Sequence, residues 1–150
     1  MNVSFFFAPG SIANAALAAS CSIGLLLLTT GMHHEALRLI RLGNAGRAGV
    51  GRARTVLVLL GISAAHLMEV LAYAVAYYVL TRFLHAGMLG GFDAPSLDTA
   101  LYFSLETYSS LGYGDIVPSG ALRGVAGAEA LNGLLLIGWS ACYVHGALDF

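Results

Sequence analysis

The stretch Ser110–Asp115, SLGYGD, holds the residues whose type and spacing have the clearest chemical meaning in this chain. Two glycines flank a tyrosine, and an aspartate follows at once. Glycine adopts left-handed backbone angles readily, and alternating left-handed residues allow consecutive carbonyl groups to point the same way. A row of carbonyl oxygens can bind a cation. The spacing therefore predicts a cation-binding backbone rather than a smooth transmembrane helix or an ordinary surface loop.

The composition around this stretch is that of a membrane protein. Of the 150 residues, 58% are hydrophobic and 10% are charged, whereas a soluble domain carries about 25% charge. The net charge of −1 gives no sign of nucleic-acid binding. There is no CxxC, HExxH or Walker motif and no evident pairing of a nucleophile with a base. We expect neither an enzyme nor a resident metal or cofactor, and we expect a lipid bilayer around the chain.

Three segments are long enough to cross a bilayer, which takes about 20 apolar residues. We predict an N-terminal transmembrane helix in residues 1–31, a basic linker in residues 32–54, and a third region in residues 55–150 with transmembrane helices at 55–84 and 121–148. Positive charge stays on the cytoplasmic side of membranes. The linker is therefore expected inside, which puts the N-terminus outside and the C-terminus in the cytoplasm. The linker arginines are Arg38, Arg41, Arg47, Arg52 and Arg54.

A shorter segment, residues 96–109, is too short and too polar to span the membrane. It opens with Ser96 or Asp98 as a helix cap and continues with a helical pattern. We predict that it enters the membrane from outside, turns at residues 110–115 and leaves on the same side. Non-helical backbone at that depth is tolerated only inside protein or beside water, and the helix C-terminus adds partial negative charge. The predicted fold is an all-α membrane protein with three transmembrane helices and one re-entrant helix and loop.

Residues 101–118, LYFSLETYSSLGYGDIVP, resemble the pore helix and selectivity filter of two-helix bacterial potassium channels, in which the filter reads TVGYG. With its flanking helices the resemblance covers residues 55–148 and leaves an extra N-terminal helix. It implies a passive potassium channel of the bacterial inner membrane, with four copies of the chain around a central axis. It implies permeating potassium ions and no other cofactor. The potassium-binding filter residues that it implies are Ser110, Leu111, Gly112, Tyr113 and Gly114.

The resemblance also implies four residues that support the filter. In the proton-gated members, the carboxylates matching Glu106 and Asp115 share a hydrogen bond or one proton, which suits two close acids that cannot easily both ionise. Tyr102 and Phe103 are expected to complete an aromatic cuff behind Tyr113.

Two filter residues depart from the family pattern. Ser110 stands where most members have threonine, and Leu111 stands where most have valine. A potassium-selective channel is the leading hypothesis, with a non-selective cation channel and a non-conducting channel-like subunit as alternatives. In the last helix, Gly133 matches the position regarded as the gating hinge, although close helix packing explains a glycine there equally well.

Ionisable residues inside the predicted transmembrane helices form a second candidate site. His66 and Glu69 stand three apart on one helix face, and Glu129 lies in the last helix. We expect these three to form a buried polar cluster, which either holds the helices together or senses pH. By contrast, His33, His34 and Glu35 point to different faces of a helix, so we predict a solvated helix end there rather than a metal cluster.

Overall fold

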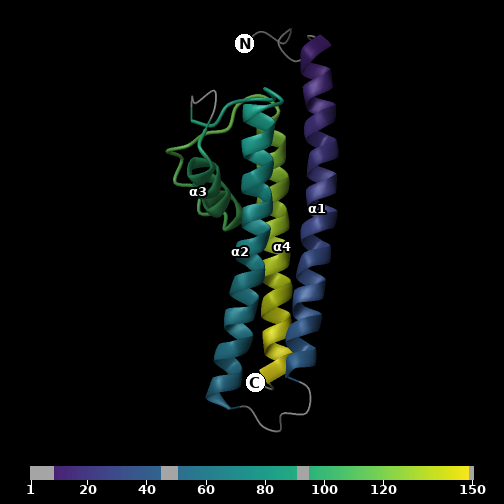
Figure 1. The fold of residues 1–150 in the computed structure, drawn as a ribbon, viewed down its shortest axis with the longest axis vertical. Helices are drawn as coiled ribbons and strands as arrows, with labels where there is room; N and C mark the ends of the chain where they lie inside the picture. Colours follow the sequence, from purple (N-terminus) through teal and green to yellow (C-terminus); the bar gives the residue numbers. More distant parts are fainter. Residues whose placement is uncertain (1–8, 45–50, 91–94, 149–150) are drawn as a thin grey trace.

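The computed structural model describes residues 9–44, 51–90 and 95–148. This part of the chain forms four helices, α1 (Pro9–Gly43), α2 (Arg52–Arg82), α3 (Leu97–Tyr108) and α4 (Leu122–Leu148). The three long helices α1, α2 and α4 lie side by side (Figure 1), and each is long and apolar enough to cross a membrane. The predicted class, an all-α membrane protein with three spanning helices and one short helix, is confirmed.

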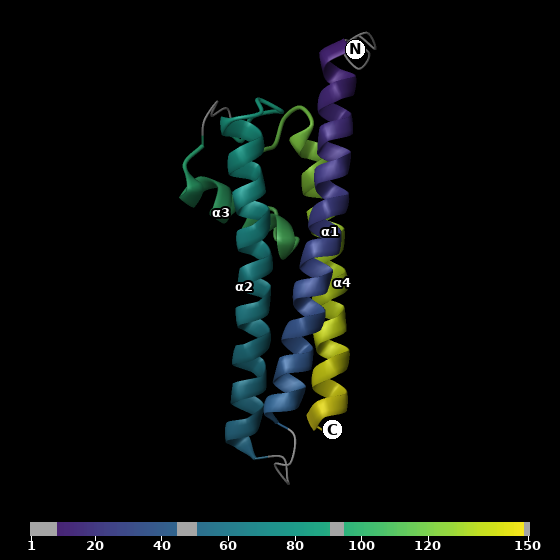
Figure 2. The same ribbon diagram turned by 45° about the vertical axis from the view of Figure 1, so that its right-hand side comes forward.

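The long helices alternate in direction, and the short helix lies against one half of the bundle (Figure 1). Helix α1 packs on both α2 and α4, whereas α3 packs on α2 and α4 near the end where α2 stops. Figure 1 places α1 and α3 on different sides of the α2–α4 pair, and in the turned view of Figure 2 α1 overlaps α4 while α3 passes behind α2. Groups that reach inward from α1 and from the end of α3 can therefore meet inside the bundle.

The first helix is longer than the sequence predicted, because residues 32–43 of the predicted linker continue α1. These residues are good helix formers with an apolar stripe. Leu37 and Ile40 on that stripe pack with Val58 and Ile62 of α2, so tertiary contacts extend the helix. At about 1.5 Å per residue the helix is about 52 Å long, well beyond a hydrocarbon core of about 30 Å.

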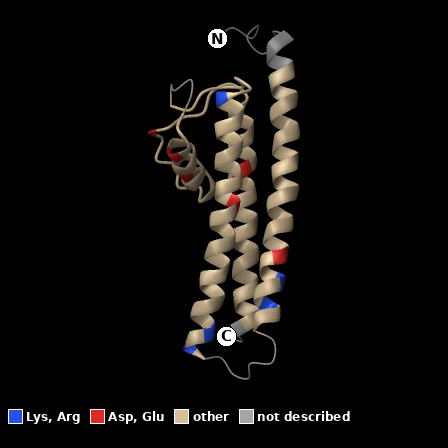
Figure 3. Ribbon diagram, in the orientation of Figure 1, with Lys and Arg blue, Asp and Glu red and all other residues tan. Residues whose placement is uncertain are grey.

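Basic residues gather at the end of the bundle where α1 finishes and α2 begins (Figure 3). Glu35 and Arg38 form an exposed ion pair there, at 3.0 Å. Arg47, predicted with the other linker arginines, lies outside the described residues. The arginines that the structure describes at this end are Arg38, Arg41, Arg52 and Arg54.

At the opposite end, the segment after α2 pairs with the segment before α4. The Gly90 amide donates to the Val117 carbonyl at 3.1 Å, and Leu89 and Pro118 form an antiparallel bridge. A side chain at Gly87 would place its Cβ 2.2 Å from the Ser119 carbonyl oxygen. Gly120 has φ of +59°, and its Cβ would lie 2.9 Å from the Ala86 carbonyl oxygen. The two backbones touch here, and this contact ties the chain leaving residues 110–115 to the end of α2.

Candidate functional site

Helix α3 is built to end at the glycine-rich loop. The Ser96 hydroxyl caps its start by accepting the Thr99 amide at 3.4 Å, and Asp98 in the first turn suits the positive end of the helix. Burial of one face holds the helix in place. On that face the Ser104 hydroxyl lies 2.9 Å from the Val70 carbonyl oxygen of α2. The helix ends at Tyr108, and Ser109 is its C-cap.

The four amide groups of residues 110–113 all turn back onto the last turn of α3. Each of them donates a hydrogen bond to Thr107 or Glu106, so the loop is fixed to the helix through its N–H groups. The bonds are Ser110 to the Thr107 carbonyl at 3.0 Å, Leu111 and Gly112 to the Glu106 carbonyl at 2.8 and 3.3 Å, and Tyr113 to the Glu106 carboxylate at 3.0 Å.

The backbone of the loop alternates as the glycine spacing predicted. Ser110, Gly112 and Gly114 have φ of +57°, +56° and +78°, and the residues between them lie outside the left-handed region. In the described part of the chain, no hydrogen bond is accepted by the carbonyl oxygens of residues 110–113, and these residues are exposed on the single chain. The loop therefore presents unpaired carbonyl oxygens, which are cation ligands, on a backbone anchored through its amides.

A left-handed serine is the costly element of this loop. For a residue with a side chain, left-handed angles cost roughly 1–2 kcal/mol, and Ser110 is one of only two non-glycine residues with positive φ in the described chain. Such strain persists where the surroundings impose it and is concentrated at functional sites. The sequence showed the two glycines of this alternation but gave no sign that Ser110 shares it.

Glu106 and Asp115 lie near the loop but bind different groups. Glu106 is buried and accepts the Tyr113 amide, whereas Asp115 accepts the Tyr102 hydroxyl at 2.9 Å. The expected hydrogen bond between the two carboxylates is therefore not formed. Burial raises the pKa of Glu106, the Tyr113 amide lowers it, and the charge of Asp115 raises it further, for a net increase. The electrostatic coupling of the two acids remains, although they are not bonded.

The aromatic cuff expected behind Tyr113 stays a prediction. Phe103 packs edge-to-face on Tyr77 of α2, with ring centroids 5.0 Å apart. It is buried because it lies on the face of α3 that forms the core with α2 and α4. Tyr102 lies on the other face and bonds Asp115, while the Tyr113 side chain is 68% exposed on the single chain.

The buried cluster predicted from His66, Glu69 and Glu129 divides into two. Glu129 of α4 is fully buried and is bonded by the hydroxyls of Tyr77 and Ser104. Tyr77 stands eight residues after Glu69, which is about 12 Å along α2. Glu129 therefore contacts α2 more than two turns away from Glu69. Its carboxylate links α4 to Tyr77 of α2 and to Ser104 in the middle of α3, and not to Glu69.

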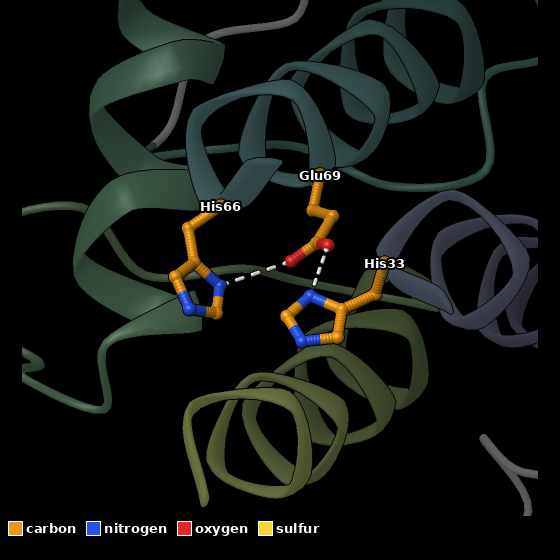
Figure 4. A group of neighbouring side chains, drawn as sticks. All are labelled: His33, His66 and Glu69. Atoms are coloured by element: carbon orange, nitrogen blue, oxygen red, sulfur yellow. Dashed lines mark hydrogen bonds and ion pairs between the residues drawn. The ribbon is translucent and has the colours of Figure 1, made fainter. Parts of the chain in front are cut away.

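His66 and Glu69 meet His33, which the sequence had placed at a solvated helix end (Figure 4). That prediction is wrong for His33, which is fully buried, and holds for His34 and Glu35, which are exposed. His33 Nδ1 lies 2.8 Å from Glu69 Oε1, and His66 Nδ1 lies 3.1 Å from Glu69 Oε2. The missed signal is the spacing of polar residues in α1, because Ser22, Thr29 and His33 lie seven and four apart on one face.

Two hydroxyl groups complete this histidine–glutamate cluster. The Tyr108 hydroxyl, at the end of α3, bonds the Glu69 carboxylate and lies 2.8 Å from His66 Nδ1. The Ser140 hydroxyl of α4 lies 3.1 Å from His66 Nε2 and 3.2 Å from His33 Nε2. All four helices therefore contribute to one buried polar group directly behind the end of α3.

Gly133 lies where α4 touches the end of α3. A Cβ at this position would lie 2.1 Å from the Tyr108 carbonyl oxygen and 2.9 Å from its carbonyl carbon. No side chain fits at such distances. This contact supports the packing explanation of Gly133, and its expected role as a hinge stays a prediction.

These features define a membrane protein in which a short helix and an irregular loop are held between two long helices, which is the architecture of a channel subunit. Residues 65–148 match the family model described as ion channel. Because this match covers more than half of the chain, the protein belongs to the ion channel family. No curated protein and no solved structure matches the chain.

Proposed function

We propose that four copies of this chain form a passive, potassium-selective channel. In this proposal the carbonyl oxygens of residues 110–113 replace the hydration shell of potassium, and Gly114 allows the chain to leave the filter. The observation that carries the proposal is the alternation of left-handed residues at Ser110, Gly112 and Gly114, combined with amides that are all bonded to α3. Rings of such carbonyls are the known basis of potassium selectivity.

Assembly into a ring is supported by the carbonyl oxygens and the apolar side chains that are exposed on a single chain. A single loop offers carbonyl oxygens from one side only, whereas a dehydrated ion needs oxygens all around it. On α4, large apolar side chains at Leu131, Leu134 and Leu135 are exposed on the single chain. Neighbouring copies and lipid are the partners that such a surface suits. A fourfold arrangement is the one in which this type of filter conducts.

The orientation follows from the charge at the end of the bundle. Arginines gather where α1 ends and α2 begins (Figure 3), and positive charge stays on the cytoplasmic side. We therefore place the filter end of the bundle outside and the C-terminal end of α4 in the cytoplasm, within a bacterial inner membrane. In this orientation the end of α2 and the start of α4 lie on the same side of the membrane as the filter loop.

The test is ion flux through purified protein in potassium-loaded vesicles, followed with a proton-coupled dye. A Gly112→Ala variant should lose flux or selectivity, because alanine at φ of +56° is strained by roughly 1–2 kcal/mol. Gly24→Ala is the matched control, since its Cβ also meets open space but on the regular helix α1. It should conduct like the unmodified protein.

The outcomes separate the competing functions. Absence of flux at every pH and voltage would favour a non-conducting subunit and contradict the proposal. Equal flux in potassium and sodium gradients would favour a non-selective cation channel, for which the observation is Ser110 and Leu111 in place of the usual threonine and valine. Full flux through Gly112→Ala would show that ions do not pass along this loop.

A further inference from the structure

We propose that His33, His66 and Glu69 form a binding site for a divalent transition-metal ion, with zinc as the best fit. This site is separate from the ion pathway and joins α1 to α2 inside the bundle. The sequence alone predicted no resident metal, because it holds no CxxC or HExxH motif and His33 was expected at a solvated helix end. The inference concerns resident metal binding and does not depend on potassium conduction.

The donor set suits such an ion. Two imidazoles and one carboxylate are the ligands that zinc and related ions take in many protein sites. One ligand atom from each residue lies within 4.8 Å of the others. The two oxygens of Glu69 point to different imidazoles (Figure 4). Ligand atoms around a tetrahedral zinc ion lie about 3.3 Å apart, so the pairs now at 2.8 and 3.1 Å need to separate by only a few tenths of an ångström.

When both imidazoles are neutral, the cluster has fewer hydrogens than short contacts. Six short contacts join the side chains of His33, His66, Glu69, Tyr108 and Ser140. With both imidazoles neutral and the carboxylate ionised, these groups carry four hydrogens, one on each imidazole and one on each hydroxyl. Two contacts therefore lack a hydrogen, and a cation between the three ligands would replace the hydrogen in the two contacts between Glu69 and the imidazoles.

With a metal ion present, both imidazole Nδ1 atoms and the Glu69 carboxylate have a ligand role. Each imidazole then binds the ion through Nδ1 and keeps its hydrogen on Nε2. The Ser140 oxygen has two lone pairs and lies 3.1 and 3.2 Å from these two nitrogens, so it accepts from both. This contact fixes both rings in the tautomer that a metal requires. The Tyr108 hydroxyl donates to Glu69, and the partial negative charge at the end of α3 favours a cation.

An ion can reach the site from one side. A cavity of about 470 Å³ between α2 and α4 is lined by His66, Ser140 and His145 together with apolar residues. The His66 side chain is 20% exposed, whereas the side chains of His33 and Glu69 are fully buried. The exposed imidazole would meet the ion first, and the two buried ligands would then enclose it. Trp139 lies beside His33, with ring centroids 5.3 Å apart.

The experiment measures metal binding by the purified full chain in detergent after removal of metal by a chelator. Equilibrium dialysis against zinc should show one ion bound per chain, and cobalt in its place should give the intense visible absorption of a low-symmetry site. His33→Ala should weaken zinc binding about 100-fold or more, because it removes a ligand. The matched control is the neighbouring exposed His34→Ala, which should bind zinc like the unmodified protein.

A second variant keeps the test valid if loss of His33 disturbs folding. His33→Cys retains a metal ligand and should add a thiolate-to-cobalt charge-transfer band that the unmodified protein lacks. Absence of bound zinc and of the cobalt spectrum in the unmodified protein would overturn the proposal, and the cluster would then be a buried histidine–glutamate ion pair. Zinc binding that His34→Ala weakens as much as His33→Ala would also overturn it, because the ion would then sit at the surface.

Discussion

Replacing Gly133 by alanine tests whether α4 and α3 are held together by direct backbone contact. The added Cβ would lie 2.1 Å from the Tyr108 carbonyl oxygen. A carbon and an oxygen that are not bonded to each other need about 3.4 Å, slightly less than the contact range of about 3.5–4.0 Å for two carbon atoms. The helices must therefore separate by about 1 Å. Since the obstacle is backbone, no side-chain rotation relieves it.

The expected cost follows from this displacement. Overpacking a well-packed core costs typically 1–3 kcal/mol and occasionally more, and the rigid obstacle puts Gly133→Ala at the upper end. Alanine in place of glycine inside a helix stabilises the folded protein by about 1 kcal/mol, which offsets part of this cost. We expect a net loss of about 2 kcal/mol, with the end of α3 and the loop of residues 110–115 displaced from α4.

The assay is thermal unfolding of the purified protein in detergent, with Gly127→Ala as the matched control. Gly127 lies in the same helix, but its Cβ would meet nothing within 4 Å, so this variant should unfold at the same temperature or higher. A pure hinge role for Gly133 predicts unchanged or raised stability with altered opening. If Gly133→Ala is as stable as Gly127→Ala, the packing explanation is refuted.

Two further variants test the burial of Glu106 and the attachment of α1. The pKa of Glu106 is raised, so its charged form is disfavoured in the folded protein. Lowering the pH from about 8 to about 5 should therefore raise the unfolding temperature of the unmodified protein relative to that of Glu106→Gln. Parallel curves of unfolding temperature against pH for the two proteins would contradict this. Thr29→Val removes the hydroxyl that accepts from Asn132 at 2.7 Å and should cost about 1–2 kcal/mol in thermal unfolding. The exposed neighbour Thr30→Val should cost less than about 0.5 kcal/mol.

Local patterns allowed the sequence to predict the helices and the loop. Hydrophobic length identified the three spanning helices, and the capping pattern at Ser96 identified the start of the short one. The glycine spacing predicted the alternation of the loop backbone, because positive φ is a local property of glycine. Each of these features depends on residues that are neighbours in the chain.

Contacts between helices could not be predicted from the sequence. His33 was misjudged because its burial depends on the way α1 packs against α2 and α4. Glu129 was assigned to the wrong cluster, because spacing within one helix says nothing about the height at which another helix crosses it. The pairing of Glu106 and Asp115 came from a family pattern, and the Tyr102 hydroxyl takes the place of the second carboxylate here.

The contact between the loops at Gly87 and Gly120 limits how this protein can change during evolution. Each glycine faces a backbone oxygen of the other segment at 2.9 Å or less from its would-be Cβ, so no substitution at either position can be accommodated by rotating a neighbouring side chain. These two sites are closed to every other amino acid unless the backbones part. A library randomised at both positions and selected for folded protein should return glycine at each.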